Sequence, residues 1–218
     1  MKNYINKLSI LILTVFFTAC ATKNSAQENE NKVYDTNWKS LANHNEAPTW
    51  FQDAKFGIYF HWGIYSVPAY SNEWYPRHMH IPNHAAYKHH VETYGHPSKF
   101  GYHDFIPMFK AEKFDAAEWA DLFQKSGAKF AGPVSEHADG FAMWDSDLTK
   151  WDAKDMGPKR DIMGELSQEI RKRDMKFIAT FHRQWLFGWY PTWDKNTDAS
   201  NPEYAGLYGP KLKKGDFV

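Results

Sequence analysis

Three short apolar segments, each followed at once by polar residues, constrain the fold of this chain more than any other feature. They are Phe56–Phe60, Ala128–Val134 and Lys176–Phe181. A strand that is buried on both faces reads as a nearly continuous apolar run, as in a parallel sheet, whereas a half-exposed strand alternates. The three segments therefore predict neighbouring parallel strands of an α/β fold.

An amphipathic segment between the first two strands is expected to form a helix. Asp115 can cap this helix, and Gly127 suits the position just after its end. Its apolar face would carry Trp119, Leu122 and Phe123.

A second helix is expected between the second and third strands. It begins near Asp161, and its apolar residues recur every four positions at Ile162, Leu166 and Ile170. The cations at 171–173 lie at its C-terminal end, where they complement the helix dipole. Strand and helix thus alternate, which predicts right-handed strand–helix–strand crossovers.

The number of legible strands predicts part of a barrel. A complete (β/α)8 barrel takes about 250 residues, and this chain has 218. Only three strands can be read, and Lys214–Val218 carries no helix end or closing pattern. We therefore expect residues 38–218 to form the truncated N-terminal portion of a (β/α)8 TIM-like barrel.

The N-terminus has the pattern of an export signal. Lys2 and Lys7 precede the apolar stretch Leu8–Ala19, which is too short to span a bilayer, and Cys20 follows it. Cys20 is the only cysteine of the chain, and its position resembles a bacterial lipobox. We expect residues 1–19 to be a signal peptide, Cys20 to carry the lipid, and residues 20–37 to be a flexible tether. The alternative is an ordinary signal peptide with a chance cysteine.

Composition excludes two classes of protein. The chain holds 26 Lys and Arg against 26 Asp and Glu, so it lacks the positive field of a nucleic-acid-binding protein. Aromatic residues make up 17% of the chain, whereas disordered chains are poor in them. We therefore expect a folded protein with no nucleic acid as partner. Together with the N-terminal pattern, this predicts a bacterial lipoprotein that is exported to the periplasm or the outer membrane.

Polar side chains follow each predicted strand and mark a candidate site. The three positions are His61 after the first strand, Glu136 and His137 after the second, and His182 after the third. In parallel α/β folds these carboxyl ends converge on one mouth. Trp62 and Trp74 lie near them, and an indole can cover the C–H face of a sugar.

These residues belong to four motifs that, in combination, resemble α-L-fucosidases of glycoside hydrolase family 29. The motifs are Trp50–Gly63, Glu73–Tyr75, Glu136–Phe141 and Gly157–Asp161. The resemblance covers roughly Trp38 to the C-terminus and implies the N-terminal part of a catalytic TIM barrel. It also implies that fucosylated glycans are the partners of the site.

The resemblance assigns the binding residues one by one. In the family, the histidine of the first motif and the Glu–Trp pair bind the fucose hydroxyls, a role that carries over to His61, Glu73 and Trp74. Many members read His-His-Asp-Gly-Phe where this chain has Glu136–Phe141. Glu136 and His137 are therefore expected in the pocket. His182 is the best match for a family tyrosine.

The resemblance also implies that the two catalytic carboxyl groups are absent from this chain. The family hydrolyses terminal α-L-fucosyl linkages by a retaining mechanism, which needs a nucleophile and an acid/base. The nucleophile lies in a Trp-Phe-Asp-like motif that this chain lacks, and the acid/base follows later. We therefore expect that this chain carries neither catalytic carboxylate and that it is inactive on its own. The alternative is a noncatalytic fucose-binding or glycan-binding lipoprotein of the same fold.

A metal site is the remaining alternative for the histidines. Eight of the 11 histidines fall between His61 and His103. Pro76 and Pro82 would break any helix that aligned His78, His80 and His84, and no His-Glu-x-x-His motif is present. The sequence therefore predicts solvated histidines near a pocket mouth, with no metal and no cofactor.

Overall fold

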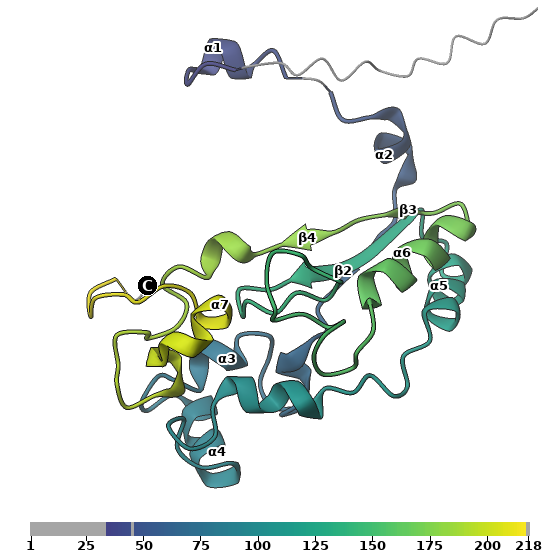
Figure 1. Ribbon diagram of the computed structural model, residues 1–218. Coiled ribbons are helices and arrows are strands. Elements are labelled where there is room, and N and C mark those ends of the chain that lie inside the picture. The colour runs from purple at the N-terminus through teal and green to yellow at the C-terminus, as the bar shows by residue number, and fades with distance from the viewer. Residues whose placement is uncertain (1–33, 45, 217–218) are drawn as a thin grey trace, which may run out of the picture. The chain divides into compact units, whose positions relative to one another are not determined.

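The computed structural model describes residues 34–44 and 46–216, drawn as coloured ribbon in Figure 1. The chain divides into a unit ending at Glu46 and a larger unit from Ala47 onward. The described part of the first unit contains helix α1, Trp38–Leu41, whose N-cap is Asn37. The predicted signal peptide, Cys20 and most of the predicted tether lie outside the described residues. In the described ranges, no helix is long and apolar enough to cross a membrane.

The larger unit is built on parallel strands with β2 in the middle. The strands are β1 Gly57–Phe60, β2 Phe130–Glu136, β3 Lys176–Phe177 and β4 Thr180–Phe181. β1 pairs with one edge of β2, while β3 and β4 pair with the other, and all the pairings are parallel. The α/β class and the parallel sheet are confirmed.

Helices connect and flank these strands. They are α2 Thr49–Ala54, α3 Tyr75–His78, α4 Ala85–Thr93, α5 Ala116–Lys125, α6 Ile162–Lys172 and α7 Ala205–Tyr208. Short 3-10 helices occupy Ile64–Ser66, Tyr102–Met108, Arg183–Trp185, Asp198–Ser200 and Pro202–Tyr204. α5 leads into β2 and α6 leads into β3, and the two helices pack against each other beside the sheet (Figure 1).

The predicted caps and most of the apolar faces are confirmed. Asp115 accepts hydrogen bonds from the backbone of α5, and Asp161 accepts one from Gly164 of α6. In α6, Ile162, Leu166 and Ile170 are fully buried. Burying each such side chain contributes about 1.5–3 kcal/mol.

One predicted face was wrong at a single residue. Leu122 of α5 is 65% exposed, because the buried line of this helix runs through Ala116, Ala120 and Phe123. Each residue advances about 100° around a helix, which places Leu122 outside that line. Trp119 packs as predicted, with its ring centroid 4.9 Å from that of Trp62.

The third predicted strand is interrupted. Lys176–Phe181 forms β3 and β4 with a break at 178–179. The Ile178 N–H donates to Ala131 of β2, and in a parallel ladder the Ile178 carbonyl would accept from residue 133. That residue is Pro133, which has no N–H, so one ladder bond cannot form.

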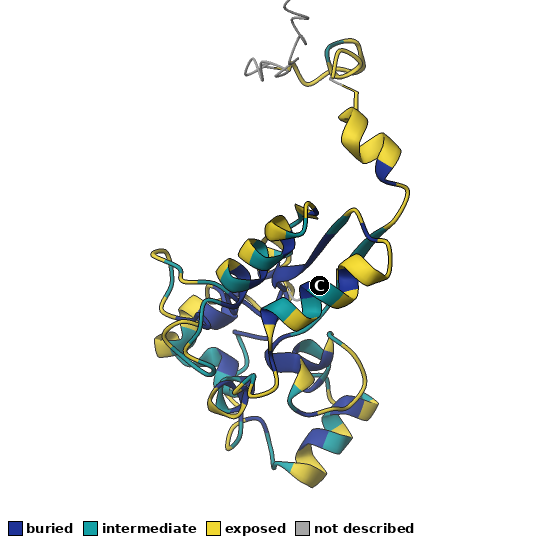
Figure 2. Cartoon of the chain, turned by 90° about the vertical axis from the view of Figure 1, so that its right-hand side faces the viewer, coloured by how far each residue is buried: buried dark blue, intermediate teal, exposed yellow. Residues whose placement is uncertain are grey.

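Burial is greatest along β2, where every residue after Phe130 is buried. Figure 2 shows the contrast with α2, which is exposed except at Ala54. The largest fully buried side chains include Tyr75, Tyr102, Tyr190 and Tyr208. Because the core is rich in tyrosine hydroxyls, polar partners are needed inside it. The Asp139 and Asp198 carboxylates accept from Tyr102 and Tyr208, the Tyr75 hydroxyl pairs with His90, and Tyr190 donates to the Asp139 carbonyl.

Candidate functional site

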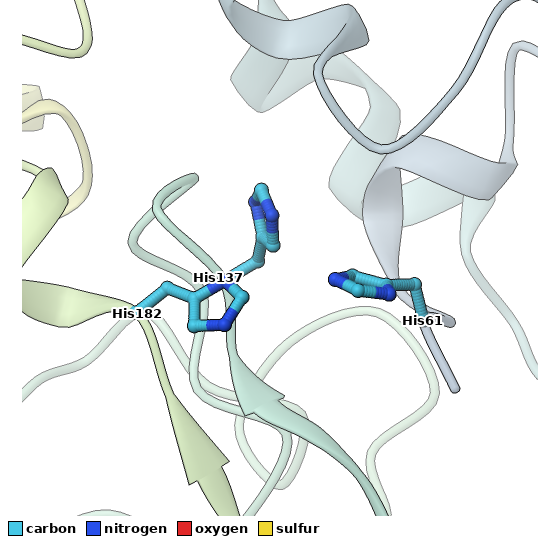
Figure 3. Close-up of side chains that lie close together, drawn as sticks. All are labelled: His61, His137 and His182. Atoms are coloured by element: carbon cyan, nitrogen blue, oxygen red, sulfur yellow. The ribbon is translucent and has the colours of Figure 1, made fainter. Parts of the chain in front are cut away.

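Three histidines from three strand ends meet in one cluster. His61 follows β1, His137 follows β2 and His182 follows β4. Their ring centroids lie 5.3 Å apart for His61 and His137, 4.9 Å for His137 and His182, and 5.8 Å for His61 and His182. Figure 3 shows the three side chains gathered at the carboxyl ends of the strands. We call these residues the histidine cluster.

Aromatic side chains surround the histidine cluster. The Tyr59 hydroxyl lies 3.4 Å from His182 Nε2, and the Tyr65 ring lies 5.4 Å from the His137 ring. On another side, the Trp189 ring stands 5.5 Å from that of His137. The cluster is therefore a polar patch with apolar walls.

Burial favours the neutral imidazole at two members of the histidine cluster, His61 and His137. Burial, reinforced by the neighbouring imidazoles of His182 and His61, lowers the pKa of His137 to about 3. Burial also lowers the pKa of His61, an effect that Glu73 opposes and His182 reinforces. A neutral imidazole offers one donor and one acceptor, which suits a hydroxyl group. His137 Nδ1 is buried and has no hydrogen-bond partner within the described chain.

Glu73 and Trp74 approach the histidine cluster through different contacts. Glu73 lines a cleft of about 230 Å³ together with His61, Tyr65 and Asn72. Trp74 is 42% exposed, and its ring lies 4.7 Å from that of Trp189, which reaches His137. An exposed indole beside a polar cluster is available to a ligand.

Glu136 has a partner of its own. Its buried carboxylate accepts a hydrogen bond from Arg183 Nη1 at 2.6 Å. Burial raises the pKa of Glu136, while the hydrogen bond and the charge of Arg183 lower it. The structure thus ties Glu136 to the residue that follows His182.

Hydrogen bonds to Asp139 fix the segment that follows His137. This buried carboxylate accepts from the Tyr102 hydroxyl at 2.6 Å and from the Phe141 N–H at 3.3 Å. Burial raises the pKa of Asp139 to about 7. Next to it, Gly140 has φ +81°, and a Cβ there would stand 2.1 Å from the Leu207 carbonyl oxygen, so only glycine fits.

The other sequence candidates lie elsewhere. Trp62 packs against Phe109, Phe114 and Trp119 and does not contact the histidine cluster in the described structure. Among His78, His80 and His84, the first and last stack at 4.1 Å, while His80 bonds to Asp198. The sequence did not identify Tyr65 or Trp189 as site residues, because no motif or spacing links them to the strand ends.

Comparison with known proteins gives one family. The chain matches the family model described as alpha-L-fucosidase over residues 21–215. It is 41% identical to the tissue alpha-L-fucosidase of Rattus norvegicus, over 72% of this chain and 33% of that protein. It is 42% identical to the human plasma alpha-L-fucosidase, over 72% and 33%. The chain thus spans about a third of the length of these relatives.

A solved structure matches the fold as well. The crystal structure of the Thermotoga maritima alpha-fucosidase in complex with fucose superimposes with a TM-score of 0.62 and 37% sequence identity. The match covers 79% of this chain and 44% of that one.

Proposed function

The chain belongs to the α-L-fucosidase family, glycoside hydrolase family 29, and we propose that its histidine cluster binds the fucosyl group of fucosylated glycans. The observation that carries this proposal is the convergence of His61, His137 and His182 at the strand ends. The ring nitrogens of the three imidazoles can donate hydrogen bonds to sugar hydroxyls or accept them. The exposed ring of Trp74 supplies the flat apolar face that a sugar also needs.

Each remaining residue of the site has a role in this proposal. Glu73 accepts from a sugar hydroxyl, because it lines the cleft beside His61. Glu136 acts through Arg183, because its carboxylate is already bonded there. Fucose is a 6-deoxy sugar, so one edge of its ring ends in a methyl group. The indoles of Trp74 and Trp189 lie together on one side of the cluster and suit that edge.

We further propose that the complete reaction is retaining hydrolysis of terminal α-L-fucosyl linkages. That reaction needs two carboxyl groups about 5–5.5 Å apart, one on each side of the glycosidic bond. Within the described residues the carboxylates next to the cluster are Glu73 and Glu136, and Glu136 is paired with Arg183. The nucleophile and the acid/base are therefore assigned to residues outside the described part of the chain.

The first prediction is that residues 1–218 alone do not hydrolyse an aryl α-L-fucoside. The reaction needs a pair of opposed carboxyl groups, and the Glu136 carboxylate is already paired with Arg183. The measurement is release of the aryl group by the purified chain, with Glu73→Gln and Glu136→Gln as controls. Turnover near that of an ordinary enzyme, about 10 per second, that either control abolished would mean that the catalytic carboxylates lie on this chain.

The second prediction tests sugar binding itself. Replacing His61 by alanine should weaken binding of L-fucose by roughly tenfold to a hundredfold, since losing one hydrogen bond to a desolvated partner costs about 1–3 kcal/mol. Isothermal titration of L-fucose into the chain measures the change. The matched control is His96→Ala, because His96 bonds locally to Ser98, away from the cluster. Equal affinities of the two variants would remove His61 from the site.

A further inference from the structure

We propose that the histidine cluster is also a binding site for a divalent transition metal such as Zn²⁺, held by His61, His137 and His182. One ring nitrogen from each residue can be chosen so that all three lie within 4.8 Å of one another. Imidazole nitrogen is a preferred ligand of zinc, and three histidines with an open fourth position form a well-known zinc geometry.

The side chains need only a modest movement to reach that geometry. With Zn–N bonds of about 2.0–2.1 Å, tetrahedral ligand nitrogens stand about 3.3 Å apart. His137 is buried and fixed at the end of β2, whereas His61 and His182 are only partly buried. The two outer rings can therefore close on the central one by side-chain rotation, without displacement of the strands.

The ring nitrogens of the cluster are available for a metal. His137 Nδ1 is buried without a partner in the described structure, and the contact from His182 Nε2 to the Tyr59 hydroxyl is long at 3.4 Å. The Tyr65 hydroxyl is likewise buried without a partner next to the His137 ring. Ligand histidines are oriented by hydrogen bonds to a second set of residues, and Tyr59 and Tyr65 are placed to supply them.

Local charge also favours a cation. Glu73 lines the cleft beside His61, and its negative charge acts on that imidazole. The nearest cation after the third strand, Arg183, is neutralised by its ion pair with Glu136. A divalent ion at the cluster thus meets one free carboxylate and no free guanidinium from these residues.

The other histidines of the described chain do not offer such a set. The His78 and His84 rings are stacked with 25° between their planes, and no third possible ligand among the described residues joins them. Both nitrogens of His80 face oxygens, of Pro76 and Asp198. Both nitrogens of His90 are used in the same way, by the Tyr75 hydroxyl and the Phe100 carbonyl.

Metal and sugar would compete for the same nitrogens. This consequence rests on the proposed function, because it assumes that the imidazoles also bind fucose. A bound zinc ion would remove their acceptor capacity and fill the space between them. Zinc would therefore act as a competitive inhibitor of fucose binding, whereas the metal site itself requires no sugar.

The test is titration of the full chain with Co²⁺, followed by displacement with Zn²⁺. A tetrahedral nitrogen site gives Co²⁺ an intense visible absorption, and we expect it to saturate at one ion per chain. The His182→Ala variant should lose this absorption and bind Zn²⁺ more than about a hundredfold more weakly, since even an outer-sphere change costs 10- to 100-fold. His96→Ala should retain both signals, and circular dichroism checks that each variant is folded.

The outcomes separate the two proposals. No cobalt absorption, or equal absorption in His182→Ala and the wild type, would overturn the metal site. Absorption that depends on His182 and is removed by adding L-fucose supports both the metal site and the shared position. Absorption that depends on His182 but is unaffected by fucose supports the metal site and contradicts sugar binding at the cluster.

Discussion

A Gly132→Ala variant should fail to fold. Gly132 lies in the middle of β2, where an added Cβ would stand 1.8 Å from the carbonyl oxygen of Ile178 and 2.8 Å from its carbonyl carbon. Those atoms belong to the backbone that links β3 to β4 and cannot rotate away as a side chain would. The strands must separate, and we expect a loss of at least about 4 kcal/mol, at the extreme of single substitutions.

Thermal unfolding followed by circular dichroism measures this effect. The control is Gly215→Ala, because a Cβ there meets nothing within 4 Å and the change should leave the melting temperature nearly unaltered. A Gly132→Ala protein that melts within a few degrees of wild type would contradict the close pairing of β2 with the Phe177–Thr180 segment. It would also question the placement of His182, which β4 positions.

Replacing Asp198 by alanine should cause the second large loss of stability. The Asp198 carboxylate lies 3.0 Å from His80 Nε2 and 3.1 Å from His103 Nδ1, and it accepts from the Tyr208 hydroxyl. The His80 side chain is fully buried, and its other nitrogen donates to the Pro76 carbonyl. Removing the carboxylate leaves the buried polar groups of His80 and Tyr208 without their partner, at a cost of about 1–3 kcal/mol for each group.

The same pair predicts an acid transition. Burial alone would raise the pKa of Asp198, but the hydrogen bonds from His103, His80 and Tyr208 outweigh it and bring the pKa below the ordinary value of 3.8. A carboxyl group with a lowered pKa stabilises the fold above its unfolded pKa and loses that contribution as the pH falls further. Wild-type stability should therefore fall below about pH 4, and Asp198→Ala should remove most of that dependence.

Urea unfolding between pH 2 and pH 7 tests both expectations for Asp198. Asp155→Ala is the matched control, because Asp155 is exposed and should leave the free energy of unfolding and its pH dependence unchanged. If Asp198→Ala behaved as the control does, the buried His80–Asp198 pair would carry no stability.

The sequence predicted those features that depend on local pattern. The strands were legible because each is a short apolar run, and the caps at Asp115 and Asp161 because they precede periodic helices. The meeting of His61, His137 and His182 could be expected because the carboxyl ends of parallel strands share one edge. The break opposite Pro133 could have been expected too, since the proline lies inside the second predicted strand.

Contacts between distant segments could not be predicted in this way. His80 and Asp198 are 118 positions apart, and no spacing rule joins them. Trp189 reaches His137 from a segment without periodicity, and Glu136 pairs with Arg183 only because β2 and β4 are neighbours. The sequence brought the three members of the histidine cluster together but predicted no metal there, because their spacing along the chain matches no metal-binding motif.

A ¹⁵N–¹H correlation spectrum of the histidine side chains tests most directly whether the imidazoles of His61, His137 and His182 contact fucose. Each imidazole is assigned by substitution, and L-fucose is then added to the chain. The signals of His61, His137 and His182 should shift with a common saturation curve, while those of His84 and His96 stay in place. Saturable binding of fucose that leaves the three signals unmoved would show that the histidine cluster does not contact the sugar.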